Sequence, residues 1–469
     1  MRQKLAALVV VAAAVGVGLA VGASWRRPRG GDMVAERVAE LDARVWPLAQ
    51  AIDEAADYLV RVNGADGRFE YVRFVDGREG PAGQYNVLRH AGSIYALSDY
   101  VLAAGGRSGD VGSREGAPAI AQRASETASR ASAYLVSRYI RPLGRDPELL
   151  AVWSDPREEA GSSRLPAAKL GGAGLALVAL ASEAGVDRRV REAGAGAADA
   201  GAADAGAPAL ETMRGLARFI CFMQQPSGAF YAKYEEEQGY VRDAESLYYP
   251  GEAILALTML YEIDPDDRWR DAAARGISQL IESRRGAKTL PNDHWLMIAI
   301  DRFLPHHTGA APATKAEMLE HAIALGRAMM KEQADTLATN HDPNVAGAFD
   351  TEGRTTPAAT RLEGLLALEH AVAESPEHAA FRDELRVTIR RGVAFLRRSQ
   401  VRDGVARGGV PRSQSGAAVG GDVPDAGAGE ARQEQEVRID YVQHALSALL
   451  RYAATCAGRT DCPPEGRAP

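Results

Sequence analysis

Two kinds of apolar segment alternate along this chain, and their alternation limits its fold more than any other feature. The first kind is amphipathic, with apolar residues on one face and charged residues on the other, as in a helix with one side in water. Six segments are of this kind, and they are centred on residues 56–59, 132–135, 217–220, 277–280, 327–329 and 393–396. Because the pattern recurs along the whole chain, it indicates a repeated structural unit.

The second kind of segment is apolar on nearly every side, which predicts a buried helix. Its six members each follow an amphipathic segment, and they cover residues 86–97, 170–180, 251–257, 293–300, 361–368 and 440–449. Such alternation is typical of an (α/α)6 toroid, in which the buried helices form an inner ring and the amphipathic helices surround it. We therefore predict an all-α fold of six helical hairpins, since strand patterns are few and the best of them, residues 69–74, is short.

Three loops carry a related motif, in which an amide side chain is followed four residues later by a glycine. The loops are Asn63–Phe69, Gln224–Phe230 and Gln400–Gly404. They resemble degenerate copies of the QxxxGxW repeat of the terpenoid cyclase and prenyltransferase toroids, with Phe in place of Trp in the first two. The helical pattern is also similar to that of the six-hairpin glycosidases and related polysaccharide lyases. The resemblance implies a toroid rather than a particular reaction.

Two activities of those toroids are disfavoured. Squalene-cyclase-like enzymes carry a DxDD proton donor at an inner helix, whereas Asp264–Asp267 follows the third inner segment, where it is expected to cap the next helix. Protein prenyltransferases hold zinc through an Asp, a Cys and a His, and no cysteine begins an inner segment here. A terpenoid-cyclase-like enzyme is the least favoured alternative, because aromatic faces hold carbocations and aromatic residues make up only 6% of the chain.

The N-terminus predicts a transmembrane anchor. Leu5–Ser24 is an uninterrupted run of apolar or small residues, long enough to cross a bilayer as a helix, and basic residues flank both of its ends. A cleaved signal peptide is the alternative. Residues 1–30 are thus expected to use the membrane as a partner and to tether a toroid domain, residues 31–455, in the periplasm or on the cell surface. Flexible insertions are expected near residues 105–118, 193–207 and 413–431, where small residues predominate.

The tail, residues 456–469, and the overall charge refine this description. Cys456 and Cys462 lie six residues apart, and a small disulfide loop is expected in an oxidising compartment. The net charge of −7, without a basic stripe, argues against a nucleic acid as partner. Nucleophile-elbow, P-loop and dinucleotide motifs do not occur in the sequence, so no cofactor is predicted.

Polar residues gather where the inner helices are expected to begin. The loops at these N-terminal ends would surround one open mouth, where backbone N–H groups favour anions. Six residues are candidate catalytic acids and bases: Glu252, Asp293, Glu363, Asp440, His90 and His444. Eight more are candidates for ligand binding: Tyr85, Asn86, Arg89, Tyr249, His294, Trp295, Arg361 and Tyr441.

Each of these acids and bases also has a structural interpretation. The two aspartates could be N-caps, the two glutamates could favour the helix dipole, and the two histidines could be hydrogen-bonded core residues. A metal site made by His90, His294 and His444 is not predicted, because no HxH or HExxH spacing occurs.

The residue types at this predicted mouth suit sugar chemistry. Paired carboxylates serve glycoside hydrolysis, and a His or Tyr base could drive β-elimination or epimerisation of an acidic glycan. We therefore predict a cell-envelope carbohydrate-active enzyme, a glycan hydrolase or lyase that works by carboxylate and histidine acid–base chemistry. The alternative is a non-catalytic toroid that binds a glycan, peptide or lipid, with its carboxylates all paired with Arg89, Arg361 or Lys169.

Overall fold

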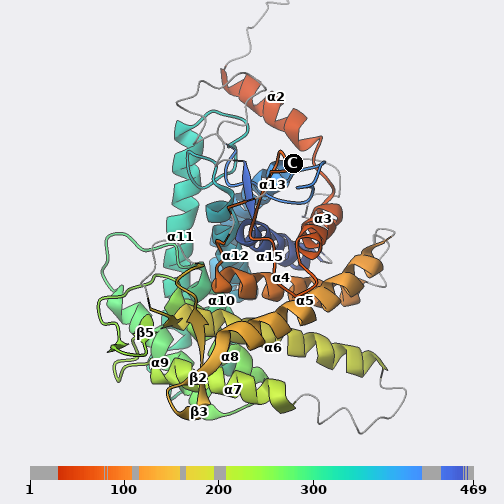
Figure 1. Ribbon diagram of the computed structural model, residues 1–469. Coiled ribbons are helices and arrows are strands. Elements are labelled where there is room, and N and C mark those ends of the chain that lie inside the picture. Colours follow the sequence, from red (N-terminus) through yellow and green to blue (C-terminus); the bar gives the residue numbers. More distant parts are fainter. Residues whose placement is uncertain are drawn as a thin grey trace, which may run out of the picture.

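A computed structural model describes residues 30–78, 80–81, 83–107, 116–158, 165–194, 207–414, 435–457, 459 and 462. Six of its helices form a closed inner ring (Figure 1), in which each helix contacts the next along the chain and the last returns to the first. They are α4 (Val87–Arg107), α6 (Leu170–Gly194), α8 (Tyr249–Ile263), α10 (His294–Phe303), α12 (Thr355–Ala371) and α15 (Ile439–Cys456). The sequence prediction of the inner ring is therefore confirmed.

An outer layer of six helices surrounds the ring, and each packs against the two inner helices that flank it in chain order. These helices are α3 (Leu48–Arg61), α5 (Ala117–Tyr139), α7 (Ala207–Phe222), α9 (Asp267–Ser283), α11 (Lys315–Thr339) and α13 (Ala379–Ser399). A further helix, α2 (Gly30–Asp42), precedes them and is tied to α13 by an ion pair of 2.5 Å between Asp42 and Arg398. Two 3-10 turns, η2 (Leu304–His306) and η3 (Pro376–His378), complete the helical elements described.

Two small antiparallel sheets correct the prediction of an all-α fold. In the first, β1 (Val72–Phe74) pairs with β7 (Glu436–Arg438). The second has five strands in chain order: β2 (Ile140–Leu143), β3 (Asp146–Ser154), β4 (Ala167–Lys169), β5 (Lys233–Glu235) and β6 (Gly239–Tyr240). Strand β3 contacts both α5 and α7, so it lies between two outer helices. Its short apolar run was missed because periodicity alone does not separate a buried strand from part of a buried helix.

The amide–glycine motifs join neighbouring outer helices. Gln224, two residues after the end of α7, donates its side-chain amide to the Gly228 carbonyl at 3.2 Å and to the Ala272 carbonyl of α9 at 2.9 Å. Gly228 has φ of 91°, and a Cβ there would lie 2.5 Å from the Arg275 carbonyl oxygen. Only glycine allows both this backbone conformation and this close approach to α9. The turn therefore fixes α7 on α9.

Two departures from the predicted motif appear in the last two hairpins. Gln400 pairs with Gly408, not Gly404, and also bonds the Ala51 carbonyl of α3, which closes the outer layer on its first helix. Gln333 makes the same pair of bonds to Gly347 and to the Thr388 carbonyl of α13, a copy that the sequence did not reveal.

The expected anchor, Leu5–Ser24, lies outside the described residues, as do most of the predicted insertions, namely residues 108–115, 195–206 and 415–434. By length and composition, Leu170–Arg189 of α6 would suffice to span a membrane, but 78% of this apolar stretch is buried, as befits an inner helix of the ring. The predicted disulfide between Cys456 and Cys462 is formed, with the two Cα atoms 5.6 Å apart.

Candidate functional site

Three ionisable residues from three inner helices meet at the N-terminal side of the ring. His294 is the first residue of α10, and Glu363 and His444 lie within α12 and α15. His444 Nδ1 and Glu363 Oε2 are 2.7 Å apart, and the His294 and His444 rings meet edge to face with centroids 5.6 Å apart. One ligand atom from each residue lies within 4.8 Å of the other two. We call these three residues the central cluster.

His294 is buried without a hydrogen bond. Its exposed fraction is 2%, and neither ring nitrogen has a partner among the described residues. Burial holds the pKa of His294 well below its ordinary value, and the nearby His444, Arg361 and Arg451 lower it further. The imidazole is therefore neutral and keeps one free acceptor nitrogen, which is the form that a general base needs.

His444 has the opposite electrostatics. Burial lowers the pKa of His444, but the Glu363 carboxylate attracts the imidazolium and accepts its hydrogen bond, so the net shift is upward. The other carboxylate oxygen of Glu363, Oε1, is buried and has no hydrogen bond to any residue that the structure describes. Two histidines whose pKa values are displaced in opposite directions can act as base and acid in one reaction.

Aromatic side chains close the ring beneath the central cluster. Trp295 of α10 approaches Tyr95 of α4, on the opposite side of the ring, with centroids 6.5 Å apart, and Arg451 donates to the Tyr95 hydroxyl at 2.7 Å. The Trp295 ring also lies 5.0 Å from that of His294 and 6.2 Å from that of His444. The buried Trp295 ring therefore packs beneath both histidines of the central cluster. Neither Tyr95 nor Arg451 was predicted from the sequence as a site residue. An arginine within an otherwise apolar helix could have indicated Arg451, because a buried guanidinium needs a polar partner.

Glu252, in the first turn of α8, is a buried acid with an unpartnered oxygen. Its exposed fraction is 4%, and Oε2 has no hydrogen bond among the described residues. Burial raises the pKa of Glu252 well above its ordinary value, and the charge of Asp293 adds to this. A Cβ at Gly171 would lie 2.3 Å from Glu252 Oε2 and from Tyr249, so glycine at the start of α6 makes room for both side chains. Burial therefore favours the protonated form of Glu252.

The two predicted aspartates are bound by other groups. Asp293 caps α10 by accepting from the Leu296 amide at 3.0 Å, and its other oxygen accepts from Arg284 at 2.6 Å. Asp440 accepts from Arg438 at 2.9 and 3.0 Å and pairs with Arg89 at 3.1 Å.

Burial raises the pKa of the Asp440 carboxyl, but Arg89 and Arg438 outweigh that effect and lower it overall. Both aspartates thus occupy structural positions at the rim.

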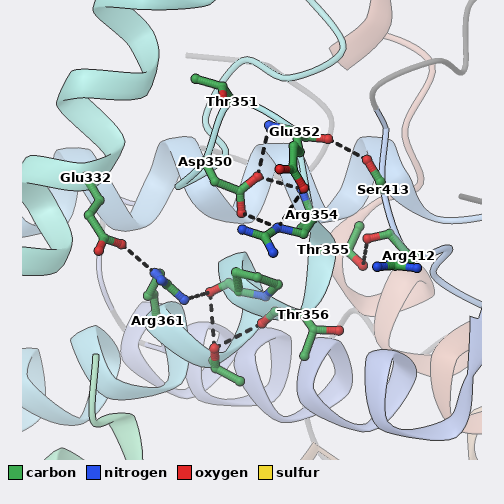
Figure 2. A network of polar contacts seen from close by, with 12 residues as sticks. Glu332, Asp350, Thr351, Glu352, Arg354, Thr355, Thr356, Arg361, Arg412 and Ser413 are labelled. Atoms are coloured by element: carbon green, nitrogen blue, oxygen red, sulfur yellow. Dashed lines mark hydrogen bonds and ion pairs between the residues drawn. The ribbon is translucent and has the colours of Figure 1, made fainter. Parts of the chain in front are cut away.

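Arg361 and the start of α12 belong to a polar network shown in Figure 2. Arg361 pairs with Glu332 of α11 at 2.8 Å and donates to the Pro357 carbonyl at 3.2 Å. Asp350 accepts from the Arg354 amide at 3.1 Å, just before the helix. Thr355 donates to the Pro411 carbonyl at 2.6 Å, which holds the α12 N-terminus against the segment that follows α13. This network positions the helix that carries Glu363.

Two further predicted ligand residues are engaged within the protein. Asn86 accepts from the Leu88 and Arg89 amides at the start of α4, as an N-cap does. The Tyr441 hydroxyl donates to Glu436 at 2.6 Å, and the Arg438 guanidinium lies over its ring.

His90 and Tyr85 lie between α4 and α5, away from the central cluster. The Tyr85 hydroxyl lies 2.6 Å from His90 Nδ1, and His90 Nε2 lies 2.9 Å from the Ala131 carbonyl of α5. That carbonyl only accepts, so Nε2 carries the proton and Nδ1 accepts from Tyr85. The same hydroxyl accepts from the Phe69 amide at 3.2 Å. With both ring nitrogens occupied and burial lowering its pKa to about 4, His90 fits a structural role.

The central cluster has a donor set, two histidines and one carboxylate, that is typical of zinc sites. No metal site was predicted from the sequence, because that prediction considered only ligands a few residues apart. These three residues come from three different helices, so no short motif contains them. Glu363 Oε2 and His444 Nδ1 already bond to each other, so a metal ion would have to replace that bond.

Comparison with known proteins bears on the fold. No family model matches the chain, and no curated protein does. Among solved structures, a sugar epimerase from a ruminal bacterium matches with a TM-score of 0.57 and 12% identity, over 90% of this chain and 99% of its own. The chain has the (α/α)6 toroid fold.

Two other solved structures share this toroid. The cellobiose 2-epimerase of Bacillus thermoamylovorans matches with a TM-score of 0.53 and 12% identity, over 84% of this chain and 95% of its own. A GH76 α-mannanase of Bacteroides thetaiotaomicron matches with a TM-score of 0.50 and 10% identity, over 87% of this chain and 96% of its own. At such identities the likeness concerns the fold alone.

Proposed function

We propose that this protein is a carbohydrate-active enzyme that moves a proton on a sugar, as an epimerase or isomerase does. One observation carries the proposal: His294, which is neutral and has no hydrogen bond within the described part of the chain, faces His444, whose proton is stabilised by Glu363. A base and an acid of the same residue type, poised by their surroundings in opposite protonation states, suit proton abstraction next to a carbonyl group.

The reaction follows from these two groups. His294 takes the proton from the carbon beside the carbonyl of an open-chain sugar, and the electron pair moves to the carbonyl oxygen. His444 donates its proton to that oxygen, which gives a neutral enediol. To form the epimer, that hydroxyl gives its proton back to His444, His444 delivers it to the opposite face of the same carbon as the carbonyl re-forms, and the two histidines regain their starting states by exchange with water. To form the isomer, His294 returns its proton to the neighbouring carbon while the hydroxyl on the first carbon gives its proton to His444, which restores both histidines. No oxidant, reductant or further reactant is consumed.

The toroid neighbours support sugar as the substrate class. Two of the matched structures are described as a sugar epimerase and a cellobiose 2-epimerase, and the third as an α-mannanase. The proposal keeps the predicted carbohydrate-active enzyme but replaces hydrolysis or β-elimination with epimerisation, the chemistry that the histidines favour.

Glycoside hydrolysis is the second candidate, because Glu252 has the property of a general acid. Its carboxyl is buried, one of its oxygens, Oε2, has no hydrogen bond among the described residues, and its pKa is raised. Hydrolysis also needs a free carboxylate as base or nucleophile. Asp293 and Asp440 are bound by arginines, so this role finds less support. A toroid that only binds ligands is disfavoured as well, since among the described residues Glu252 forms no ion pair with a predicted cation and Glu363 pairs with His444 instead.

A location in the cell envelope is part of the proposal. The disulfide of Cys456 and Cys462 supports an oxidising compartment, and Leu5–Ser24 would supply the tether. Fractionation of cells that express the full chain, with protease added from outside, tests this location independently of the reaction.

Hydrogen exchange distinguishes the two reactions. The purified protein is incubated in D2O with mannose, glucose, cellobiose and manno-oligosaccharides, and the products are examined by NMR. We expect deuterium at the carbon beside the carbonyl, lost in His444→Gln and retained in the exposed control His341→Gln. New reducing ends without deuterium would instead establish hydrolysis, and the absence of both would overturn the proposed reaction.

A further inference from the structure

Large apolar side chains are exposed unevenly over the described surface. Five are exposed there, and three of these, Phe222, Leu247 and Tyr248, lie between the end of α7 and the start of α8. The other two, Val387 and Val405, lie in the last third of the chain. Exposed apolar residues that gather in one region mark binding surfaces more often than scattered ones do.

Four aromatic rings form a continuous cluster in this region. Tyr240 stacks on Tyr231, with centroids 4.4 Å apart, and on Phe222, with centroids 5.1 Å apart. Tyr234 meets Tyr240 edge to face at 5.5 Å. Phe222 is 37% exposed, and the three tyrosines are half-buried. We call Phe222, Tyr231, Tyr234 and Tyr240 the aromatic platform.

The sheet connects this platform to the rim of the ring. Lys233 of β5 lies opposite Lys169 of β4, and Lys169 directly precedes α6, an inner helix. After β6 the chain leads to Tyr248, whose ring meets that of His294 edge to face at 5.2 Å. Aromatic side chains therefore occur both over β5 and β6 and beside the central cluster.

The charges near the platform disfavour an anionic ligand. Lys233 is paired with Glu235 at 2.6 Å, which offsets its charge. The Arg242 guanidinium, which lies over the Tyr231 ring, adds one positive charge. The turn between β5 and β6 exposes Glu236 and Glu237, which would repel a polyanion. Tyrosine offers an apolar face and a polar hydroxyl edge, which together match the apolar and hydroxyl-bearing faces of an uncharged sugar.

We propose that the aromatic platform binds the outer units of a neutral oligosaccharide whose terminal unit reacts at the central cluster. This inference rests on the proposed function for the identity of the reacting unit, but it adds that the substrate is a chain rather than a single sugar. Binding at the platform does not require turnover, so the two ideas can fail separately.

Calorimetric titration with cello- and manno-oligosaccharides of two to six units tests the platform. We expect affinity to rise with chain length in the wild type. In the double variant Phe222→Ala, Tyr240→Ala the affinity for the hexasaccharide should fall roughly tenfold, while that for the disaccharide stays the same. Val405→Ala, which removes an exposed apolar residue elsewhere, serves as control, and Tyr240→Phe keeps the ring and should bind nearly as the wild type does.

Each outcome decides a separate point. Length-dependent binding that the double variant abolishes supports the platform, even if no sugar is turned over and the proposed reaction is wrong. Turnover of a sugar with affinity independent of chain length overturns the platform and leaves the reaction intact. Binding of none of these oligosaccharides, or an unchanged double variant that folds normally, also overturns the platform.

Discussion

His90 and His294 invite comparison because both are histidines near the start of an inner helix and both are almost fully buried. Around His90, the Tyr85 hydroxyl and the Ala131 carbonyl occupy the two ring nitrogens. Around His294, neither nitrogen has a partner among the described residues. Burial lowers the pKa of both rings, so neither burial nor pKa direction separates the two sites.

Hydrogen-bond satisfaction separates them. A buried polar group without a partner costs about 1–3 kcal/mol, so His294 lowers the stability of the fold where His90 raises it. A group that is kept at such a cost calls for an explanation, and a ligand that supplies the missing partner is one. The orphaned nitrogens, rather than the burial of the ring, are therefore the reason to propose His294 as the functional residue of the pair.

The largest expected effect is on His294. His294→Leu keeps a similar side-chain volume but removes the base, so we expect kcat/KM for sugar proton exchange to fall by about 10²- to 10⁴-fold. The free energy of unfolding should stay the same or rise by about 1 kcal/mol, because two unsatisfied nitrogens are lost. Kinetics by NMR and urea denaturation measure the two quantities. A loss of stability equal to that of the matching His90 variant would remove the distinction between the sites.

His90→Leu should show the reverse pattern. The Tyr85 hydroxyl and the Ala131 carbonyl lose their partner in a buried setting, so we expect the free energy of unfolding to fall by about 2–4 kcal/mol. In the folded fraction, kcat/KM should remain within about threefold of the wild type, since His90 makes no contact with the central cluster. A loss of activity larger than the loss of folded protein would contradict the structural role.

The pH dependence of stability sharpens this second test. The pKa of His90 is about 4 in the folded protein against 6.5 ordinarily, so its neutral form stabilises the fold fully above about pH 6.5. That contribution is lost as the pH falls through about 4. His90→Leu should therefore flatten the fall in stability between these values, compared with the wild type.

The toroid was readable from the sequence, whereas details of its turns were not. Alternating amphipathic and buried segments predicted all twelve ring helices, because the pattern depends only on which faces meet water. The amide–glycine pairs are separated by 4 residues at Asn63 and Gln224, but by 14 at Gln333 and 8 at Gln400. A motif with fixed spacing therefore misses Gly347 and selects Gly404 in place of Gly408.

The sequence could predict which end of the inner helices carries the candidate site, but not which of the residues there meet. The sequence placed Glu363, His294 and His444 among residues near the starts of the inner helices, but their meeting depends on three separate helices. Each residue turns the side chain by about 100° around a helix axis, so a small difference in position directs His90 toward α5 and His444 toward Glu363. Pairing across helices cannot be read from local spacing.

A variant of Glu363 tests how a neighbouring charge sets the pKa of His444. Glu363→Gln removes the charge that holds the proton on His444, and we expect kcat/KM to fall by about 10- to 100-fold. Activity needs protonated His444, so it is lost as the pH rises through the pKa of this residue, which is raised in the wild type. In Glu363→Gln that pKa falls, and the alkaline limb of the pH–rate profile should move to lower pH. A limb that does not move would show that His444 is not the acid.

Tyr85→Phe should have the smallest effect on stability and activity of these variants. It tests the hydrogen bonds of His90 without changing His90 itself. The change leaves His90 Nδ1 and the Phe69 amide without a partner, which makes His90 partly resemble His294. We expect the free energy of unfolding to fall by about 1 kcal/mol, with kcat/KM unchanged. Urea denaturation of the wild type, Tyr85→Phe and His90→Leu measures the three free energies of unfolding, which should decrease in that order. If Tyr85→Phe were as stable as the wild type, the hydrogen bonds of His90 would not be what distinguishes it from His294.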